Sequence, residues 1–146
     1  MRLTLRTNLA MRTLMVCAVN PDRVVRKSDI AQSCNASENH LGLVIHQLAQ
    51  KGFIVTLRGR TGGIRLARAP EQISVGKVVR DLEACLPFTE CFDEAQNNCP
   101  LTQDCVLRGL FGGALEAFYA ELDPVSLADL VRDNTGLRDV LALSAA

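Results

Sequence analysis

The sequence predicts a mainly α-helical protein with a small β-hairpin wing, built as a winged helix-turn-helix followed by a long dimerisation helix. Three observations predict this fold class. Apolar residues recur at helical spacing over residues 38–50, a glycine-rich hairpin follows over 53–67, and a second helical stripe runs over 104–122. Two helices joined by a short turn and followed by a hairpin are typical of winged helix-turn-helix domains.

The first elements of the chain are expected to be helical. Residues 2–19 form a helix with an apolar stripe, and the proline-containing turn at 20–22 ends it. A short extended piece follows at 24–25. Ser28 is expected to cap a short helix over 29–34, which becomes the first helix of the helix-turn-helix.

The helix over residues 38–50 is the expected recognition helix. Ser37 provides its N-cap, and Gly52 follows its end, where a left-handed residue commonly terminates a helix. Its apolar face repeats at i, i+3, i+4 and i+7 and consists of Leu41, Val44, Ile45 and Leu48. A recognition helix presents polar side chains to base edges and phosphates. The exposed candidates for DNA binding are Ser37, Asn39, His40 and Gln47, with Ser28 on the preceding helix.

The hairpin carries arginines at its tip. Strands are expected at 53–57 and 64–67, with Arg58 and Arg60 among the glycines between them. Glycine-rich loops with arginine also cradle nucleotides, but the chain has no GxxxxGK[ST] phosphate-binding loop. Behind a recognition helix, an arginine-bearing wing suits the negative potential of a narrow minor groove. Arg58 and Arg60 therefore complete the candidate DNA-binding residues.

The chain is expected to divide into a winged helix-turn-helix domain at residues 1–70 and a loop and dimerisation domain at 71–146. In the second domain, Ser74 caps a helix over 75–83 and Ser126 caps a short helix that ends at Val131. The long helix keeps an apolar stripe over four turns, formed by Leu107, Leu110, Phe111, Ala114, Leu115, Phe118 and Leu122. That stripe is too apolar for a monomer's surface, so a homodimer is expected.

Charge is divided between the two halves of the chain. Residues 1–70 hold eleven Lys/Arg against three Asp/Glu, whereas residues 71–146 hold five against thirteen, so the net charges are +8 and −8. A basic half attracts phosphates and an acidic half is repelled by them. Arginines interrupt every apolar run near the start, and no apolar stretch approaches the roughly 20 residues of a membrane span. A cytoplasmic protein with reduced thiols is expected.

Three of the six cysteines gather in an acidic loop. Seven residues separate Cys91 from Cys99 and five separate Cys99 from Cys105, without the close C-x2–4-C pairs of structural zinc sites. This wide spacing suits an iron–sulfur cluster, and the start of a long helix stabilises thiolate at Cys105. The remaining cysteines are interpreted as packing residues, and they are Cys17, Cys34 and Cys85.

From end to end the chain resembles the bacterial iron–sulfur winged-helix repressors that include IscR, RirA and NsrR. The resemblance rests on MRLTLRTNLAMRTLM at the start, on SENHLGLVIHQLAQKGFIVTLRGRTGGIRLAR, and on ECF and NCPLTQDC in the cysteine loop. The stretches RGRTGGIRLARAPEQISVGKVVRDLE and LRGLFGGALEAF favour the nitric-oxide-sensing NsrR branch. IscR-like proteins carry a histidine three residues after the last cysteine, where this chain has Arg108.

The resemblance implies a homodimeric repressor that binds double-stranded promoter DNA and holds an iron–sulfur cluster through Cys91, Cys99 and Cys105. Nitric oxide is the implied signal, and its attack on the cluster releases the DNA. In some NsrR proteins an aspartate of the first helix, supplied by the partner subunit, completes the ligand set. Asn8 occupies the matching position and is the candidate fourth ligand from the partner subunit. An amide is a poorer iron ligand than a carboxylate, so the cluster type, [4Fe–4S] or [2Fe–2S], is left open.

Two alternative functions stay open. A RirA-like iron-responsive regulator shares the three-cysteine spacing, and a cluster-free DNA-binding protein would use the same thiols for redox chemistry or zinc. An enzyme is not expected, because the chain shows no Ser/His/Asp set, paired carboxylate site or cofactor fingerprint. Both histidines, His40 and His46, lie on the predicted recognition helix.

Overall fold

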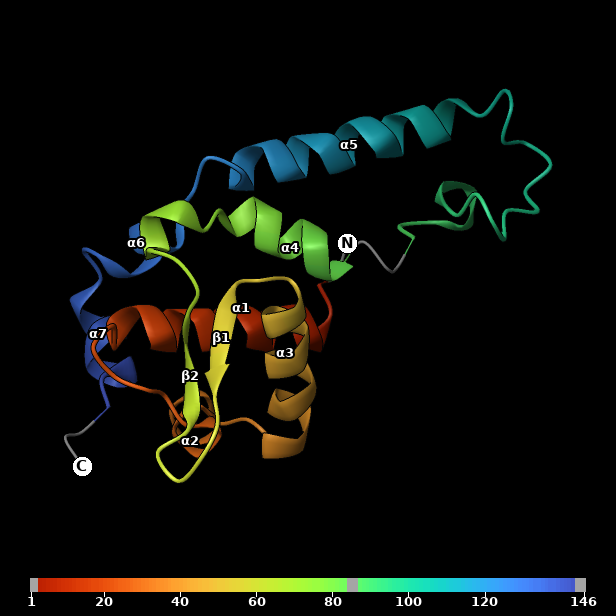
Figure 1. Ribbon diagram of the computed structural model, residues 1–146. Helices are drawn as coiled ribbons and strands as arrows, with labels where there is room; N and C mark the ends of the chain where they lie inside the picture. Colours follow the sequence, from red (N-terminus) through yellow and green to blue (C-terminus); the bar gives the residue numbers. More distant parts are fainter. Residues whose placement is uncertain (1–2, 84–86, 144–146) are drawn as a thin grey trace.

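The computed structural model describes residues 3–83 and 87–143, and Figure 1 shows how their elements are arranged. The fold is mainly helical with a two-stranded antiparallel sheet, as the sequence predicts. The elements are α1 (Leu5–Val19), α2 (Lys27–Cys34), α3 (Glu38–Gln50), β1 (Ile54–Leu57), β2 (Gly63–Leu66), the 3-10 helix η1 (Pro70–Gln72), α4 (Val75–Glu83), the 3-10 helix η2 (Glu90–Phe92), α5 (Val106–Leu122), α6 (Leu127–Val131) and α7 (Thr135–Leu141).

Helix α1 is the central element of the core. It crosses the middle of the molecule, with α3 and the sheet in front of it and α4 above it in the view of Figure 1. Its residues Ala10, Leu14 and Val16 are fully buried. They belong to one apolar cluster that also contains Leu41 of α3 and Leu127 of α6. Burying each such Leu or Val side chain contributes about 1.5–3 kcal/mol, so α1 holds both halves of the chain together.

The helix-turn-helix begins two residues earlier than capping by Ser28 would allow. Helix α2 starts at Lys27 with Arg26 as its N-cap residue, so the expectation that Ser28 caps this helix is wrong. The carboxylate of Asp29 supplies the cap interaction, because it accepts a hydrogen bond of 3.1 Å from the backbone N–H of Arg26. Ser28 is therefore an exposed residue of the first turn of α2.

The wing is a hairpin extended by a third segment. β1 and β2 pair from Ile54 opposite Leu66 to Leu57 opposite Gly63. The backbone of Val25 forms two hydrogen bonds with Ile64, of 2.8 and 2.9 Å, which confirms the extended piece predicted at 24–25. A Cβ atom on Gly63 would lie 2.5 Å from the carbonyl oxygen of Val25, so this close approach requires glycine.

Helices α4 and α5 form a layer above the core. Figure 1 shows α5 lying along α4 and continuing past the end of α4 towards the cysteine loop. Their closest approach is at Gly76, where a Cβ atom would lie 2.1 Å from Oδ1 of Asp123. Arg80 fixes the pair through ion pairs with Asp123 (2.8 Å) and Glu116 (3.5 Å), and its guanidinium lies 4.0 Å from the ring centroid of Tyr119. Helix α5 begins at Val106, two residues later than expected.

The carboxyl-terminal segment closes the core through α7, a helix that the sequence analysis did not anticipate. The side chain of Asn134 caps it by accepting a hydrogen bond from the backbone N–H of Leu137. Buried Asn20 then joins it to α1, donating to the carbonyl oxygens of Val16 and Leu141. Among the described residues, no helix is both long and apolar enough to span a membrane.

Candidate nucleic-acid interface and cysteine loop

The amino end of α3 lies at an accessible end of the molecule. Figure 1 places it beside α2 and the tip of the wing. Ser37, Asn39 and His40 are all exposed there, as expected for a recognition helix. Ser37 occupies the N-cap position, and its side chain makes no capping hydrogen bond. Its hydroxyl group therefore does not cap the helix.

The outward face of α3 differs in part from the expected one. Gln47 is half-buried, and its Oε1 atom is buried without a hydrogen-bond partner among the described residues. The residues opposite the buried face are instead Asn39, Leu43 and His46, all of them exposed. Their i, i+4, i+7 spacing was visible in the sequence. The sequence analysis placed Gln47 on this face and did not include apolar Leu43 or His46 among the DNA-binding candidates.

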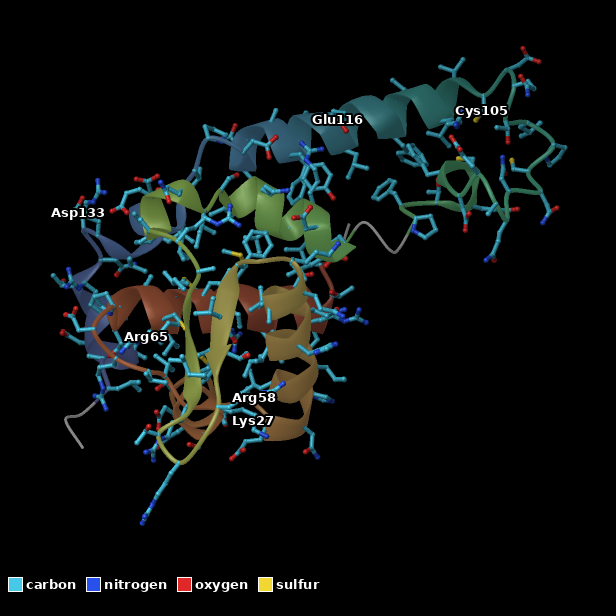
Figure 2. The ribbon with its side chains drawn as sticks, in the orientation of Figure 1. Lys27, Arg58, Arg65, Cys105, Glu116 and Asp133 are labelled. Atoms are coloured by element: carbon cyan, nitrogen blue, oxygen red, sulfur yellow. The ribbon has the colours of Figure 1, made fainter. Side chains whose placement is uncertain are left out.

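Basic groups of α2 and of the wing lie at this end. Arg58 and Arg60 of the wing tip are exposed, and Figure 2 shows Arg58 and Lys27 at the same end of the molecule. Lys27 Nζ lies 3.3 Å from Oε2 of Glu38, so this ion pair joins the first turns of α2 and α3. Arg26 is exposed beside it. The arrangement can neutralise phosphates on both sides of a groove-bound helix.

The cysteine loop lies far from this surface. Figure 1 shows the loop at the free end of α5, and Figure 2 places Cys105 at the corner of the molecule opposite Lys27 and Arg58. An aromatic contact holds the first part of the loop against α5. The Phe88 ring lies edge-to-face against the Phe111 ring, with 5.5 Å between the ring centroids. Arg108 donates a hydrogen bond of 3.1 Å from Nε to the carbonyl oxygen of Cys91. These contacts bring η2 against the first turns of α5.

The three candidate ligands are chemically suited to bind iron. Cys91, Cys99 and Cys105 are half-buried thiols without disulfide bonds. Cys105 is the N-cap residue of α5, next to the backbone N–H groups of the first turn. The Sγ atom of Cys91 lies 3.1 Å from the hydroxyl of Thr89. Within residues 3–83 and 87–143, however, no three His, Cys, Asp or Glu side chains are grouped closely enough to hold a metal ion.

The other thiols differ in environment. Cys17 and Cys34 are buried in the apolar core, as expected for packing residues. Burial raises the pKa of the Cys17 thiol to about 12, and it also raises the pKa of Cys34, where the charge of Arg12 opposes the shift. Neither thiol is suited to ligate a metal at neutral pH. Cys85 lies outside the described residues.

Asn8 is exposed on the first turns of α1, where it is accessible to a second molecule. One turn before it, Thr4 caps α1 and binds Glu83, the last residue of α4. The Glu83 carboxylate accepts hydrogen bonds from the backbone N–H and hydroxyl of Thr4 and from the hydroxyl of buried Thr7. No local pattern in the sequence indicates this contact, which joins residues 79 positions apart.

Comparisons with known proteins agree with this architecture. The family model Rrf2, described as an iron-dependent transcriptional regulator, matches residues 3–133. The HTH-type transcriptional regulator NsrR of Geobacillus kaustophilus is 43% identical over 142 residues, which cover 97% of each chain. NsrR of Bacillus licheniformis is 38% identical over 143 residues, or 97% of this chain and 100% of the relative. The structure of T. potens IscR has a TM-score of 0.71 at 22% identity, covering 100% of this chain and 94% of that chain.

These relatives confirm the resemblance to NsrR-type proteins that the sequence motifs indicate. The IscR structure confirms the winged-helix fold. The relatives are named as transcriptional regulators, in agreement with the expectation of a regulator and not an enzyme. The match of the family model spans most of the chain. The chain belongs to the Rrf2 family of iron-dependent transcriptional regulators.

Proposed function

We propose that this regulator is a homodimeric repressor that binds promoter DNA and releases it when nitric oxide reaches an iron–sulfur cluster held by its cysteine loop. One observation carries the proposal. Three unpaired, half-buried thiols lie on a single loop that is joined at both ends to the helices supporting the winged helix. When bound, the cluster supplies iron that reacts with nitric oxide. Cys91, Cys99 and Cys105 would hold it, with Asn8 of the partner subunit as candidate fourth ligand.

The exposed stripe of α5 supports dimerisation. Leu107 is 54% exposed and Leu110 is 64% exposed, although both belong to a helix whose other end is packed against α4. A second copy of α5 is the natural cover for this stripe, because an isologous contact buries the same apolar residues of both copies. The dimer would then present two copies of α3 to half-sites about one helical turn of DNA apart, or a multiple of that distance.

The DNA-binding residues belong to the end of each protomer remote from α5. Ser37, Asn39 and His40 would meet base edges or phosphates from the start of α3, with Gln47 further along its flank. Ser28 of α2 would reach the DNA backbone, and the wing arginines Arg58 and Arg60 would enter the adjacent minor groove. The net charge of +8 over residues 1–70 supports this orientation towards DNA.

Two fixed contacts would transmit the state of the loop. Glu83 joins the end of α4 to the start of α1, and α1 packs directly against α3. At the end of α5 that is remote from the loop, Arg80 and Asp123 hold α5 against α4. When the three cysteines hold a common group, the loop is constrained, and its release changes the separation of the two recognition helices. A difference of a few kcal/mol between the two states is sufficient to change DNA occupancy strongly.

The test is a mobility-shift assay with anaerobically purified full-length protein on a DNA duplex that the protein selects from a randomised pool. Visible absorption with bound iron and sulfide should accompany DNA binding, and stoichiometric nitric oxide should abolish both. The variant with Cys91, Cys99 and Cys105 changed to alanine should lose the nitric oxide response, whereas Cys34→Ala should keep it. If the cluster-loaded protein binds DNA equally well with and without nitric oxide, nitric oxide sensing is refuted.

The same preparation distinguishes the other two functions. Release by an iron chelator without a response to nitric oxide would identify an iron-responsive regulator of the RirA type. Colourless protein containing zinc, or a disulfide whose reduction restores DNA binding, would identify the cluster-free alternative. The observation that supports the cluster-free alternative is that the three thiols are half-buried and form no disulfide bond.

A further inference from the structure

One large apolar side chain lies among polar residues on the outward face of α3. Leu43 is 68% exposed and lies on the outward face of α3 between Asn39 and His46, which are also exposed. The buried face of the same helix is formed by Leu41, Val44 and Leu48, so Leu43 has no role in the core of the protomer. At this position the side chain is available to contact an apolar group of whatever binds α3.

We propose that Leu43 contacts the C5-methyl group of a thymine in the major groove and thereby makes a thymine part of the operator. The inference rests on the proposed binding of α3 to DNA. Thymine is the only base that presents a methyl group in the major groove, and apolar side chains recognise it. Leu43 has no hydrogen-bonding group, so contact with this methyl group is the specific base contact open to it.

The surroundings of Leu43 support DNA as the occupant. Its neighbour Gly42 has no side chain, and no atom lies within 4 Å of the position that a Cβ atom would take. The helix backbone beside Leu43 can therefore approach the base edges closely. Polar groups that can bond base edges, Asn39 and His46, flank it on the same face. The charged rim contains Lys27 of α2 and Arg58 of the wing, which suits a polyanion.

A second copy of the chain is the rival occupant. Leu43 also lines a shallow cavity of about 290 Å³ between α1 and α3, together with exposed Leu5. A protein surface covering this cavity would bury the same side chain. Removal of the Leu43 side chain distinguishes the two occupants. If DNA is the occupant, the variant loses base discrimination, and if a second copy is the occupant, it loses self-association.

The experiment uses the cluster-loaded full-length protein and a duplex selected from a randomised pool. Each thymine of the duplex is replaced in turn by uracil, which removes only the methyl group, and dissociation constants are measured by fluorescence anisotropy. At the thymine read by Leu43, uracil should weaken binding of the unchanged protein on the order of fourfold, as expected for one buried methyl group. Leu43→Ala should bind thymine and uracil duplexes equally at that position.

Val140→Ala is the matched control, because Val140 is 66% exposed on α7, away from α3. It should keep the full response to uracil. A second variant, Leu43→Gln, keeps the length of the side chain and should lose the response as Leu43→Ala does. Because Leu43 is exposed, both variants are expected to fold, and circular dichroism checks this.

Three outcomes would overturn the inference. The first is retention of the uracil response by Leu43→Ala, and the second is the absence of any thymine in the selected duplex to which the unchanged protein responds. Dissociation of the dimer by Leu43→Ala, seen by analytical ultracentrifugation with an unchanged uracil response, would assign Leu43 to an interface between copies. Failure to select any duplex would refute DNA binding itself, and that result is distinct from the other three.

Discussion

Glu83 accepts two hydrogen bonds from Thr4, one of 3.0 Å from its backbone N–H and one of 2.8 Å from its hydroxyl. The contact places a carboxylate at the amino end of α1, where the helix dipole favours negative charge. It also joins the residue that ends α4 to the residue that begins α1. The segment that leads to the cysteine loop is therefore attached to the helix that supports α3.

Glu83→Ala is expected to lower the free energy of unfolding by about 1–3 kcal/mol, because the buried hydroxyl of Thr7 loses its acceptor. Urea denaturation measures the change. The control is Glu71→Ala, which removes an exposed ion pair with Arg132 and should cost under about 1 kcal/mol. The substitution at Glu83 should also weaken the effect of cluster loss on DNA affinity. Equal costs for the two variants would contradict the role assigned to Glu83.

Gly76→Ala should separate α4 from α5. The added Cβ atom would lie 2.6 Å from the backbone nitrogen of Asp123, which cannot move away without shifting the end of α5. We expect a loss of about 1–3 kcal/mol in the free energy of unfolding. Gly42→Ala is the opposite case, since it meets no atom within 4 Å and should stabilise α3 by up to about 1 kcal/mol. A stabilising Gly76→Ala would show that the close approach is not maintained in solution.

The Cys17 thiol should make stability depend on alkaline pH. Its pKa is raised by burial from 9.0 to about 12, so the unfolded chain releases the proton well before the folded protein does. The contribution is present below pH 9 and is lost as pH rises towards 12, at about 1.4 kcal/mol per pH unit. Denaturation of apo protein at several pH values should show this slope. Cys17→Ala should reduce it, and an unchanged slope would rule out Cys17 as its source.

The wing arginines should determine part of the salt dependence of DNA binding. The Arg58→Ala, Arg60→Ala double variant is expected to reduce the slope of log K against log salt by up to about 2, if each arginine neutralises one phosphate. Fluorescence anisotropy at several salt concentrations measures the slope. Arg138→Ala is the control. Arg138 is exposed on α7, and its replacement should leave the slope unchanged. Identical slopes for the wing variant and the unchanged protein would remove the wing from the interface.

Leu110→Asp should dissociate the dimer. Leu110 is 64% exposed on the apolar stripe of α5, and a charge there would be buried at the interface of two copies. Sedimentation velocity should show a monomer, whereas Val140→Asp on α7 should sediment as the unchanged protein. A dimer that tolerates Leu110→Asp would place the interface elsewhere.

Much of the fold was predictable because its signals are local. Helical spacing of Leu41, Val44 and Leu48 defines the buried face of α3, and glycine is required where the hairpin meets Val25. The caps at Ser74 and Ser126 were also predictable, since each side chain bonds a backbone N–H three residues later. Ser28 is not a cap because α2 already begins at Lys27, where the Asp29 carboxylate accepts a hydrogen bond from the backbone N–H of Arg26.

The sequence by itself therefore determined the charge difference between the two halves, and it determined the helices α1 to α6, the wing and the cysteine-bearing loop, whose signals depend on neighbours within a few residues. Only the tertiary structure decided that Glu83 meets Thr4, that Gln47 turns inward while Leu43 and His46 face outward, and that α7 closes the core through Asn20. These relationships depend on how helices distant in the chain pack against each other. Side-chain periodicity describes one helix at a time and contains no information about which surfaces will meet.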